Sequence, residues 1–465
     1  MVTINDRESY LFDSLRKLVL ANVQKTHVLI GPVYIGTQSH RCYIHKIART
    51  AKEGGRGRQT SRTTAVNYET NPPAAEFQQR ITRLFQDLLH QGDRFDTALV
   101  YNRVNQYYLT GTMQDGLLVL RKNGDVLYFV RKSYERAKLE SALNPGQLVQ
   151  IHSYRDLLSF LPENLGHTLL EMESMPLAVL ERMRKYFTFD SIHALEGTLA
   201  RLRSLKSPYE LTLIRESGRQ HSHLMEQIIP GLLHEGMSEA DLLADIYAAM
   251  VKLGHHGLSR FAMPQSEMVV GQLGFGESSL YPTNFYGPGG MAGLSAAVPT
   301  IGCRNRLLQR GDLVFVDIGY GVNGYHSDKT RIYSFGAPPP EEAVKVHTAC
   351  ISVLDKISSL MVPGNTPEHI YQTVMADLPA GLTPHFMGFG AERVKFLGHG
   401  IGLVIDEQPV IARGFKDPLQ PGMVIALEPK CGIDGLGTVG VEETYEITPQ
   451  GAVCITGGAR EILIV

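Results

Sequence analysis

Hydrophobic residues follow regular spacings only beyond Pro72-Pro73. There, apolar residues from Phe77 to Leu88 recur at helical spacing and Gly92 follows, which predicts a helix of about four turns. Short apolar runs then predict strands, with Asn123-Gly124 as a hairpin turn before the last of them; the runs are Thr97–Tyr101, Gly116–Leu120 and Val126–Val130. Alternating helices and strands up to about residue 190 predict one α/β domain.

The segment Leu202–Pro208 is predicted to link this domain to a second one, which opens with two helices. Ser207 caps the first helix, with proline at its first helical position, and Ser238 with Asp241 starts the second. The same succession recurs later, where a helix over about Glu341–Leu360 is followed by another that begins at Thr366-Pro367. This recurrence of a helix pair indicates an internal duplication.

The duplication is visible at an offset of 111 residues. Residues 308–317 align with residues 419–428, three of ten positions are identical, and both segments end an apolar run in a carboxylate. Each half has a further carboxylate in a strand-like segment, so that the pairs are Asp317 with Asp328 and Glu428 with Glu442. Two such halves facing each other would bring four carboxylates together.

Four carboxylates cannot share a small cavity as anions without a cation, because like charges raise one another's pKa values. A divalent metal resolves this repulsion, and an oxygen-rich set with one imidazole suits Mn²⁺, Fe²⁺, Co²⁺ or Zn²⁺. His399 is the candidate imidazole, since glycines on both sides let the backbone approach a crowded site closely. Taken singly, an aspartate at a strand end is more typical of a turn, and Gly-His-Gly of a loop. The joint pattern favours a metal centre.

Residues 205–450 resemble the pita-bread metallopeptidase family, which includes methionine aminopeptidase, aminopeptidase P, prolidase and creatinase. The likeness rests on VDIGYGVNGYHSDKTR (316–331), GHGIG (398–402), PGMVIALEP (421–429) and GVEET (440–444). Residues 73–200 resemble the smaller N-terminal domain of the aminopeptidase P, prolidase and creatinase branch. The resemblance implies an α/β (α+β) fold: a pita-bread C-terminal domain with an internal pseudo-twofold repeat, preceded by a smaller α/β creatinase-like N-terminal domain.

Carried over by position, the resemblance implies two divalent metal ions (Mn, Co, Zn or Fe). Asp317 would chelate one ion, His399 with Glu428 would hold the other, and Asp328 with Glu442 would bridge both. A hydroxide bridging the ions would attack the peptide carbonyl, and Glu428 would pass its proton to the leaving amine as the catalytic base. Arg331 is expected to contact the substrate or to support a ligand through a salt bridge.

Several positions depart from the family pattern. One histidine outside the metal set is replaced by Asp406, seven residues after His399, and another has no counterpart in Ser295–Thr300. An arginine two residues before the last glutamate is replaced by Gly440. Asp406 either recognises a free α-amino group or caps a local turn, and the substrate is left open because an ionised aspartate only accepts hydrogen bonds. The glycine-rich loop Gly287–Gly293 lacks the Lys-Ser/Thr that follows a phosphate-binding loop.

The charge distribution is uneven along the chain. The net charge is −2, from 45 basic and 47 acidic residues, which excludes the basic excess of a general nucleic-acid binder. Residues 1–70 nevertheless carry a net charge of +6. Their low hydrophobicity and clustered charge predict a basic, disordered extension. A nucleic-acid-binding arm and an artefact of start-site choice are the alternatives, and no aromatic residues interleave residues 48–65.

The length of 465 residues, 43% of them hydrophobic, is sufficient for several domains. We expect the extension over 1–70, a creatinase/prolidase-like domain over 71–203 and a pita-bread catalytic domain over 204–465. No run of ~18 apolar residues predicts a membrane span. The five scattered cysteines lack C-x-x-C spacing, which favours reduced thiols and a cytoplasmic location.

The leading hypothesis is a dimetal exopeptidase of the Xaa-Pro aminopeptidase or prolidase type, which hydrolyses the N-terminal peptide bond of short peptides. One alternative is a non-peptidase metalloenzyme on the same scaffold, either a small-molecule hydrolase or a lyase; Gly319 stands where the lyase is expected to carry an extra aspartate. Another is a non-catalytic protein-binding module, which retention of all five ligands disfavours. The resemblance further implies a homodimer, with no nucleic-acid or membrane partner.

Overall fold

The computed structural model describes residues 37–38, 41–42, 72–90, 95–262, 268–382 and 384–465. The chain divides into two compact units, Met1–Ala65 and Val66–Val465. In the first unit, strand β1 (Thr37–Gln38) pairs antiparallel with β2 (Arg41–Cys42). The rest of the extension predicted over residues 1–70, and with it the prediction of disorder, lies outside the described residues.

The second unit begins with an N-terminal lobe built on one six-stranded sheet in the order β6-β5-β4-β3-β7-β8. Strand β4 runs antiparallel to both of its neighbours, whereas the pairs β5–β6, β3–β7 and β7–β8 are parallel. The elements of this lobe are, in chain order, α2 (Ala74–Leu89), β3 (Thr97–Val100), α3 (Arg103–Thr110), β4 (Asp115–Arg121), β5 (Val126–Lys132), α4 (Tyr134–Glu140), η2 (Pro145–Gln147), β6 (Leu148–Gln150), η3 (Tyr154–Ser159), β7 (His167–Leu170), α5 (Leu177–Met183), β8 (Ser191–Ala194) and α6 (Glu196–Ser204).

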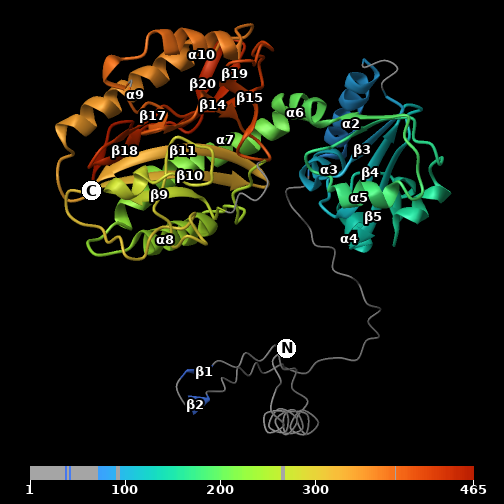
Figure 1. The fold of residues 1–465 in the computed structure, drawn as a ribbon, viewed down its shortest axis with the longest axis horizontal. Helices are drawn as coiled ribbons and strands as arrows, with labels where there is room; N and C mark the ends of the chain where they lie inside the picture. The colour runs from blue at the N-terminus through green and yellow to red at the C-terminus, as the bar shows by residue number, and fades with distance from the viewer. Residues whose placement is uncertain (1–36, 39–40, 43–71, 91–94, 263–267, 383) are drawn as a thin grey trace, which may run out of the picture. The chain divides into compact units, whose positions relative to one another are not determined.

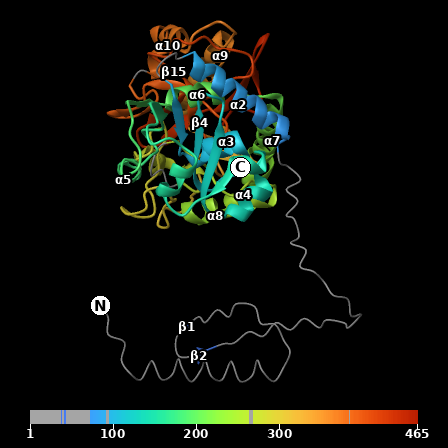
Figure 2. The ribbon, with the colours of Figure 1, turned by 90° about the vertical axis from the view of Figure 1, so that its right-hand side faces the viewer.

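The helix and the three strands predicted in this lobe are confirmed and differ from the prediction only at their ends. Helix α2 buries the apolar residues that recur at helical spacing, among them Phe77 and Leu88. Gly124 has φ +95° in the turn between β4 and β5, a conformation that glycine adopts without a Cβ penalty. Helix α2 packs along α6, at the end of the lobe (Figure 2).

The C-terminal lobe contains a four-stranded sheet, β21-β11-β10-β9, and a five-stranded sheet, β15-β14-β16-β19-β20, together with the ladders β17-β18 and β12-β13. Helix α8 covers one side of these strands, and α9 with α10 covers the other (Figure 1). The elements of this lobe are α7 (Pro208–His223), the π-helix η4 (Leu224–Ile228), η5 (Ile229–Gly231), α8 (Glu239–Lys252), β9 (Gly271–Phe275), η6 (Gly276–Leu280), β10 (Leu313–Val322), β11 (Tyr325–Ser334), α9 (Glu341–Leu360), α10 (Pro367–Ala376), η7 (Ala380–Leu382), β12 (Gly388–Phe389), β13 (Glu392–Arg393), β14 (Phe396–Gly400), β15 (Glu407–Ala412), β16 (Val424–Leu427), β17 (Lys430–Ile433), β18 (Gly437–Gly440), β19 (Glu443–Thr448), β20 (Gly451–Cys454) and β21 (Leu463–Ile464).

The internal repeat predicted from the sequence is present in the strands. The offset of 111 residues maps the first residue of β10 onto the first of β16 and the last of β10 onto the last of β17. A helix pair precedes each copy, α7 with α8 in the first and α9 with α10 in the second. The predicted α/β architecture with a pita-bread C-terminal lobe is therefore confirmed. The second copy is interrupted at residues 428–429, which places Glu428 at the break between two ladders.

The two lobes of the second unit share apolar packing. One core cluster includes Leu84 and Tyr108 from the first lobe together with Tyr325 and Ile405 from the second. The buried guanidinium of Arg80 donates to the Tyr108 carbonyl oxygen and to the Tyr325 hydroxyl, both at 3.0 Å. The domain boundary predicted between residues 203 and 204 stays a prediction; it falls at the end of α6.

Candidate metal centre

The five side chains predicted as metal ligands come together in the C-terminal lobe. Ligand atoms of Asp328, His399 and Glu442 lie within 4.8 Å of one another, and so do those of Asp317, Glu428 and Glu442. Both halves of the repeat contribute: Asp317 lies on β10, Asp328 on β11, His399 on β14, Glu428 between β16 and β17, and Glu442 between β18 and β19. The four carboxylate residues are buried, with at most 9% of their surface exposed.

Strand pairing brings the two halves into contact at these residues. In the antiparallel ladder of β10 and β11, Asp317 faces Thr330. Thr330 also forms an isolated bridge with Glu442, and its hydroxyl donates to Glu442 Oε2 at 2.9 Å. The backbone N–H of Glu428 donates to the Leu397 carbonyl oxygen at 3.1 Å, just before His399 on β14. Backbone contacts of the fold itself therefore position the cluster.

His399 lies between glycines because the neighbouring strands pack closely against its own. A Cβ on Gly398 would lie 2.2 Å from the Ala426 carbonyl oxygen, and one on Gly400 would lie 2.2 Å from that of Gln408. His399 Nδ1 lies 3.1 Å from the Gly400 carbonyl oxygen. When Nδ1 donates to that carbonyl, Nε2 carries the lone pair that a metal ligand needs. Nε2 lies 3.5 Å from Oε1 of Glu428 and 3.9 Å from Oε1 of Glu442.

One residue of the cluster, Lys430, was not predicted from the motifs. Its Nζ donates to Asp317 Oδ2 at 2.8 Å, to Glu428 Oε2 at 2.9 Å and to Glu442 Oε2 at 2.7 Å. The residue is 0% exposed. A signal for it was present in the sequence, because Lys430 follows Glu428 by two positions and residues two apart in an extended chain share a face.

Burial and mutual repulsion set the ionisation of the cluster. Burial raises the pKa of Asp317 to about 6, although Lys430 lowers it, and raises the pKa of Asp328 well above its ordinary value. Burial alone would lower the pKa of His399, but the carboxylates of Glu428 and Glu442 raise it above its ordinary value. Burial would likewise lower the pKa of Lys430, but its three carboxylate partners raise it well above its ordinary value. The cluster therefore favours bound positive charge.

The donor set fits a divalent metal ion. Carboxylate oxygens with one imidazole nitrogen suit Mn²⁺, Fe²⁺, Co²⁺ or Zn²⁺. Glu442 Oε1 is buried and has no hydrogen-bond partner among the residues that the structure describes, although buried polar atoms are normally paired. This oxygen faces His399 Nε2, and Asp328 belongs to the same group of ligand atoms. A cation held by Asp328, His399 and Glu442 would satisfy it.

The other two candidates lie outside the carboxylate cluster. Arg331 lies three residues after Asp328, on the opposite face of β11, where its Nε is 3.1 Å from Glu226 Oε1. Asp406 accepts the backbone N–H of Ala262 through Oδ1 at 2.5 Å, and its charge contributes to the raised pKa of His399. Asp406 thus has a structural contact and also acts electrostatically on the cluster. These contacts are compatible with both of its predicted roles, which are recognition of a free α-amino group and capping of a local turn.

Four histidines outside the ligand set gather near the turn that joins β10 to β11. The ring centroids of His255 and His256 are 5.0 Å apart, and those of His256 and His326 are 4.8 Å apart. His326 lies on the same strand as Asp328, and its Nδ1 is 2.9 Å from the Gly402 carbonyl oxygen. His221 Nδ1 is 3.2 Å from the Ser327 hydroxyl. These imidazoles are therefore held by ring packing, by a backbone carbonyl and by the Ser327 hydroxyl.

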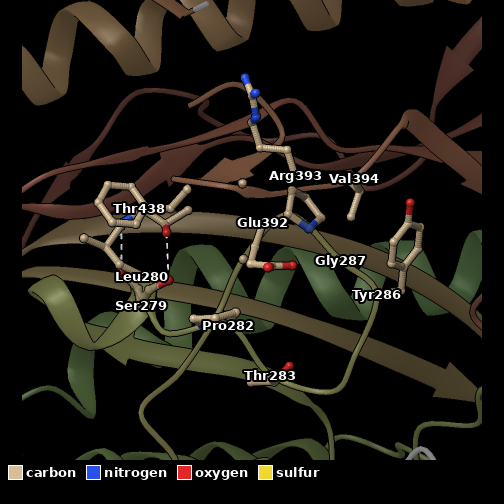
Figure 3. A pocket seen from close by; sticks show the side chains of 14 residues that line it. Ser279, Leu280, Pro282, Thr283, Tyr286, Gly287, Glu392, Arg393, Val394 and Thr438 are labelled. Atoms are coloured by element: carbon tan, nitrogen blue, oxygen red, sulfur yellow. Dashed lines mark hydrogen bonds between the residues drawn. The ribbon is translucent and has the colours of Figure 1, made fainter. Parts of the chain in front are cut away.

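The glycine-rich loop lines a small cavity of about 80 Å³. Figure 3 shows Tyr286 and Glu392 among its lining side chains, and a pair of hydrogen bonds between Ser279 and Thr438 in its wall. The ring of Tyr286 lies 5.8 Å from that of Phe396, which lies 6.3 Å from that of His399. Two aromatic rings therefore connect the cavity to the cluster.

The glycines of this loop serve close packing. A Cβ on Gly290 would lie 2.1 Å from the Tyr281 carbonyl oxygen, and one on Gly289 would lie 2.5 Å from the Phe315 ring. Backbone that approaches its neighbours this closely leaves no space for side chains. This packing accounts for the glycines at positions 289 and 290.

Comparison with known families identifies the C-terminal lobe. The model of metallopeptidase family M24 matches residues 212–449, more than half of the chain. The chain belongs to metallopeptidase family M24. The model of the creatinase/prolidase N-terminal domain matches residues 80–205. The resemblance inferred from the four motifs in residues 205–450 and the separate one inferred for residues 73–200 are therefore both confirmed.

Similar proteins include dipeptidases. A probable dipeptidase PepE from Mycobacterium bovis is 33% identical over 280 residues, which cover 57% of this chain and 62% of that protein. The chain thus spans less than two thirds of the length of this relative. An Xaa-Pro dipeptidase from Pyrococcus furiosus is 25% identical over 370 residues, which cover 79% of this chain and 95% of that protein.

Solved structures share the fold of the M24 chain. The Xaa-Pro dipeptidase from Bacillus anthracis superposes with a TM-score of 0.67 at 21% identity, and the match covers 84% of this chain and 100% of that one. Dipeptidase PepE from Mycobacterium ulcerans superposes with a TM-score of 0.66 at 23% identity, covering 85% and 99% of the two chains. At these identities the likeness establishes the two-lobed architecture.

Proposed function

We propose that this chain is a metal-dependent exopeptidase of the Xaa-Pro dipeptidase or aminopeptidase type, which hydrolyses the N-terminal peptide bond of short peptides. The observation that carries the proposal is the convergence of five potential ligands in one buried cluster, Asp317, Asp328, His399, Glu428 and Glu442. Membership of a metallopeptidase family supports it, as does the similarity to a probable dipeptidase and an Xaa-Pro dipeptidase.

In this proposal the cluster holds the metal. Asp328, His399 and Glu442 would bind a divalent ion, with Glu428 and Asp317 completing the acidic set. When bound, such an ion supplies Lewis acidity toward a peptide carbonyl and lowers the pKa of a water molecule. The family resemblance implies two ions in this set, and the position of Lys430 bears directly on the number of ions bound.

Glu428 is the residue best placed to move a proton. Its Oε2 accepts a hydrogen bond from Lys430 Nζ at 2.9 Å, while its Oε1 faces His399 Nε2 at 3.5 Å. Because Lys430 holds one oxygen, the other keeps a fixed direction within the cluster. A carboxylate fixed in this way can take a proton from the attacking water and deliver it to the leaving amine.

One feature of the surroundings suits a short peptide with a free N-terminus. Asp406 places a negative charge close enough to raise the pKa of His399, and a free α-amino group would be attracted to such a charge. One of the family's accessory histidines is replaced by Asp406 and another has no counterpart in Ser295–Thr300, so we expect slow turnover, because losing one oxyanion donor typically costs ~10²–10³ in rate.

The test measures the hydrolysis of dipeptides and tripeptides by the full chain after loading with Mn²⁺, Co²⁺ or Zn²⁺. We expect release of the N-terminal residue from at least one Xaa-Pro peptide, and loss of this activity after chelation. Bound metal without turnover of any peptide would instead favour a non-peptidase metalloenzyme. A protein that binds no metal would overturn both enzyme hypotheses and favour a protein-binding module.

Several finer expectations belong to the same proposal. A metal ion drawn from Mn, Co, Zn and Fe, a homodimer, a cytoplasmic location and the domain boundaries at 70 and 203 all stay predictions. The cysteines Cys303, Cys350, Cys431 and Cys454 are unpaired in the structure. No helix within the described ranges has both the length and the apolarity that a membrane crossing requires.

A further inference from the structure

Lys430 shares its oxygen partners with one of the two groups of potential metal ligands. That group consists of Asp317, Glu428 and Glu442. Nζ of Lys430 lies 2.7–2.9 Å from one carboxylate oxygen of each of these residues. The ammonium is therefore located where a cation bound by this group would have to be.

An ammonium and a metal ion cannot both use these three oxygens. A divalent transition metal binds carboxylate oxygens at ~2.0–2.2 Å, so an ion coordinated by the same three atoms would fall within the van der Waals volume of Nζ. An ammonium with three N–H donors instead satisfies three carboxylate oxygens at ordinary hydrogen-bond distances. It also brings a compact positive charge, which reduces the repulsion among the acids.

The remaining donors still form a second set. Glu428 and Glu442 each use Oε2 for Lys430, and each turns Oε1 toward His399 Nε2, at 3.5 Å and 3.9 Å respectively. Glu442 Oε1 is the buried oxygen that lacks a hydrogen-bond partner among the described residues. With Asp328, these atoms offer a place for one metal ion on the far side of the glutamates from the ammonium.

The surrounding backbone holds the lysine in this position. Lys430 is fully buried and faces Gly440 across the β17–β18 ladder. A Cβ on Gly440 would lie 3.0 Å from Cγ of Lys430 and 2.6 Å from its Cα. The absence of a side chain at position 440 therefore provides the space that the lysine side chain occupies.

We propose that this centre contains one divalent metal ion and one ammonium, with Lys430 in the place of the second metal ion. The ion is held by Asp328, His399 and Glu442, while Lys430 binds Asp317 and one oxygen of each glutamate, which leaves Oε1 of Glu428 for proton transfer. Lys430 is thus a positioning residue for Glu428 as well as a fixed cation. The inference rests on the proposed function and replaces its expectation of two ions.

Metal stoichiometry tests this proposal without reference to activity. The full chain is stripped with chelator, loaded with excess Mn²⁺ or Co²⁺ and desalted, and the metal content per chain is measured by mass spectrometry. We expect one equivalent of metal in the wild-type protein and two in Lys430→Ala. The substitution leaves three carboxylate oxygens without their ammonium partner, and a second metal ion can then neutralise their negative charge. The exposed Lys395→Ala is the matched control and should bind one equivalent.

Two results would overturn the proposal: two equivalents in the wild-type protein, or a single equivalent in a Lys430→Ala variant that retains the native circular dichroism spectrum. Binding of no metal by the wild-type protein is a different outcome, because it overturns the proposed metallopeptidase function as well. The two failures are therefore distinguishable.

A measurement on the wild-type protein alone covers the case in which Lys430→Ala does not fold. Electron paramagnetic resonance of the Mn²⁺-loaded protein separates an isolated ion from a pair, because neighbouring Mn²⁺ ions are exchange-coupled. We expect the hyperfine pattern of an isolated ion at every loading level. An exchange-coupled signal at full loading would contradict the proposal.

Discussion

Lys430 and Gly440 are direct neighbours across the β17–β18 ladder, and the side chain of one occupies the space left by the other. The family pattern places an arginine at position 440, two residues before Glu442. In this chain the positive charge instead comes from the opposite strand, and its Nζ reaches three of the four carboxylates. The missing side chain at position 440 and the buried charge of Lys430 therefore belong to one contact.

Gly440→Ala should be strongly destabilising. Gly440 has φ +141°, and a Cβ there would lie 2.5 Å from the Pro429 carbonyl oxygen and 2.6 Å from Cα of Lys430. Backbone strain alone costs ~1–3 kcal/mol, and the clash adds to it. We expect the free energy of unfolding in urea, followed by circular dichroism because the chain has no tryptophan, to fall by at least ~2 kcal/mol. Gly435→Ala shares the backbone strain, at φ +72°, but a Cβ there would meet nothing within 4 Å, so it should cost less; equal losses would show that the clash at Gly440 adds nothing.

Glu428→Gln should abolish most peptide hydrolysis while leaving the fold intact. The amide has nearly the shape of the carboxylate but cannot accept the proton that the reaction must move, and general-base catalysis contributes ~10²–10⁴ in rate. We expect kcat for the best Xaa-Pro peptide to fall at least ~100-fold with little change in melting temperature. Glu341→Gln alters an exposed ion pair with Lys345 and serves as the control. Full activity in the Glu428 variant would remove its assignment as the base.

Asp406→Ala should change substrate preference more than metal content. If its carboxylate attracts a free α-amino group, loss of a charged hydrogen bond of ~1.5–3 kcal/mol lowers the preference for free over N-acetylated peptides about tenfold or more. The measurement compares kcat/KM for the two peptide forms and the metal content of each variant. Asp377→Ala removes an exposed carboxylate paired with Lys356 and should change neither. Loss of a metal equivalent from the Asp406 variant would contradict this role.

Glu443→Ala should destabilise the protein because it leaves the buried ammonium of Lys329 without its ion-pair partner. Lys329 and Glu443 form an ion pair in which both side chains are 0% exposed, on the face of β11 opposite Asp328. Removing one partner leaves a buried charge, which typically costs ~3–5 kcal/mol. Glu216→Ala breaks the exposed pair with Arg219 and should cost at most ~1 kcal/mol. Urea unfolding of both variants measures the two losses in the free energy of unfolding. Similar losses would show that the burial of an ion pair does not determine the cost of breaking it.

His255 should contribute to the loss of stability in mild acid. Burial lowers the pKa of His255 from 6.5 to about 4, and its Nδ1 accepts the Gly321 N–H, which only an unprotonated nitrogen can do. As pH falls from 6.5 to 4, the unfolded chain binds a proton that the folded chain does not, so stability falls by up to about 3 kcal/mol; above pH 6.5 the contribution is complete.

The measurement compares the free energy of unfolding at pH 7 and at about pH 4.5 in the wild-type protein and in His255→Gln. The wild-type protein should lose more stability between the two values than the variant does. An equal loss in both proteins would show that His255 does not drive the pH dependence.

Local patterns in the sequence were enough for most of the architecture. The apolar spacing of Phe77–Leu88 and the cap at Ser207 act within a few residues of themselves, so the helices they predict form where expected. The repeat at an offset of 111 residues likewise pointed to both β-strand copies and to the four carboxylates. Strand alternation also separates Arg331 from Asp328, because side chains three apart in a strand lie on opposite faces.

The role of Lys430 depended on tertiary structure. The spacing of Glu428 and Lys430 suggests that they share a face, but whether that face meets solvent or the other carboxylates depends on β10, β18 and the bridge from Thr330 to Glu442, which come from distant parts of the chain. Packing these strands together excludes water from four acids, and a buried negative cluster must then be matched by cations. The spacing of the motifs identified the four carboxylates. Only the packing of the distant strands, which buries Lys430 beside Gly440, decides which positive charges neutralise them.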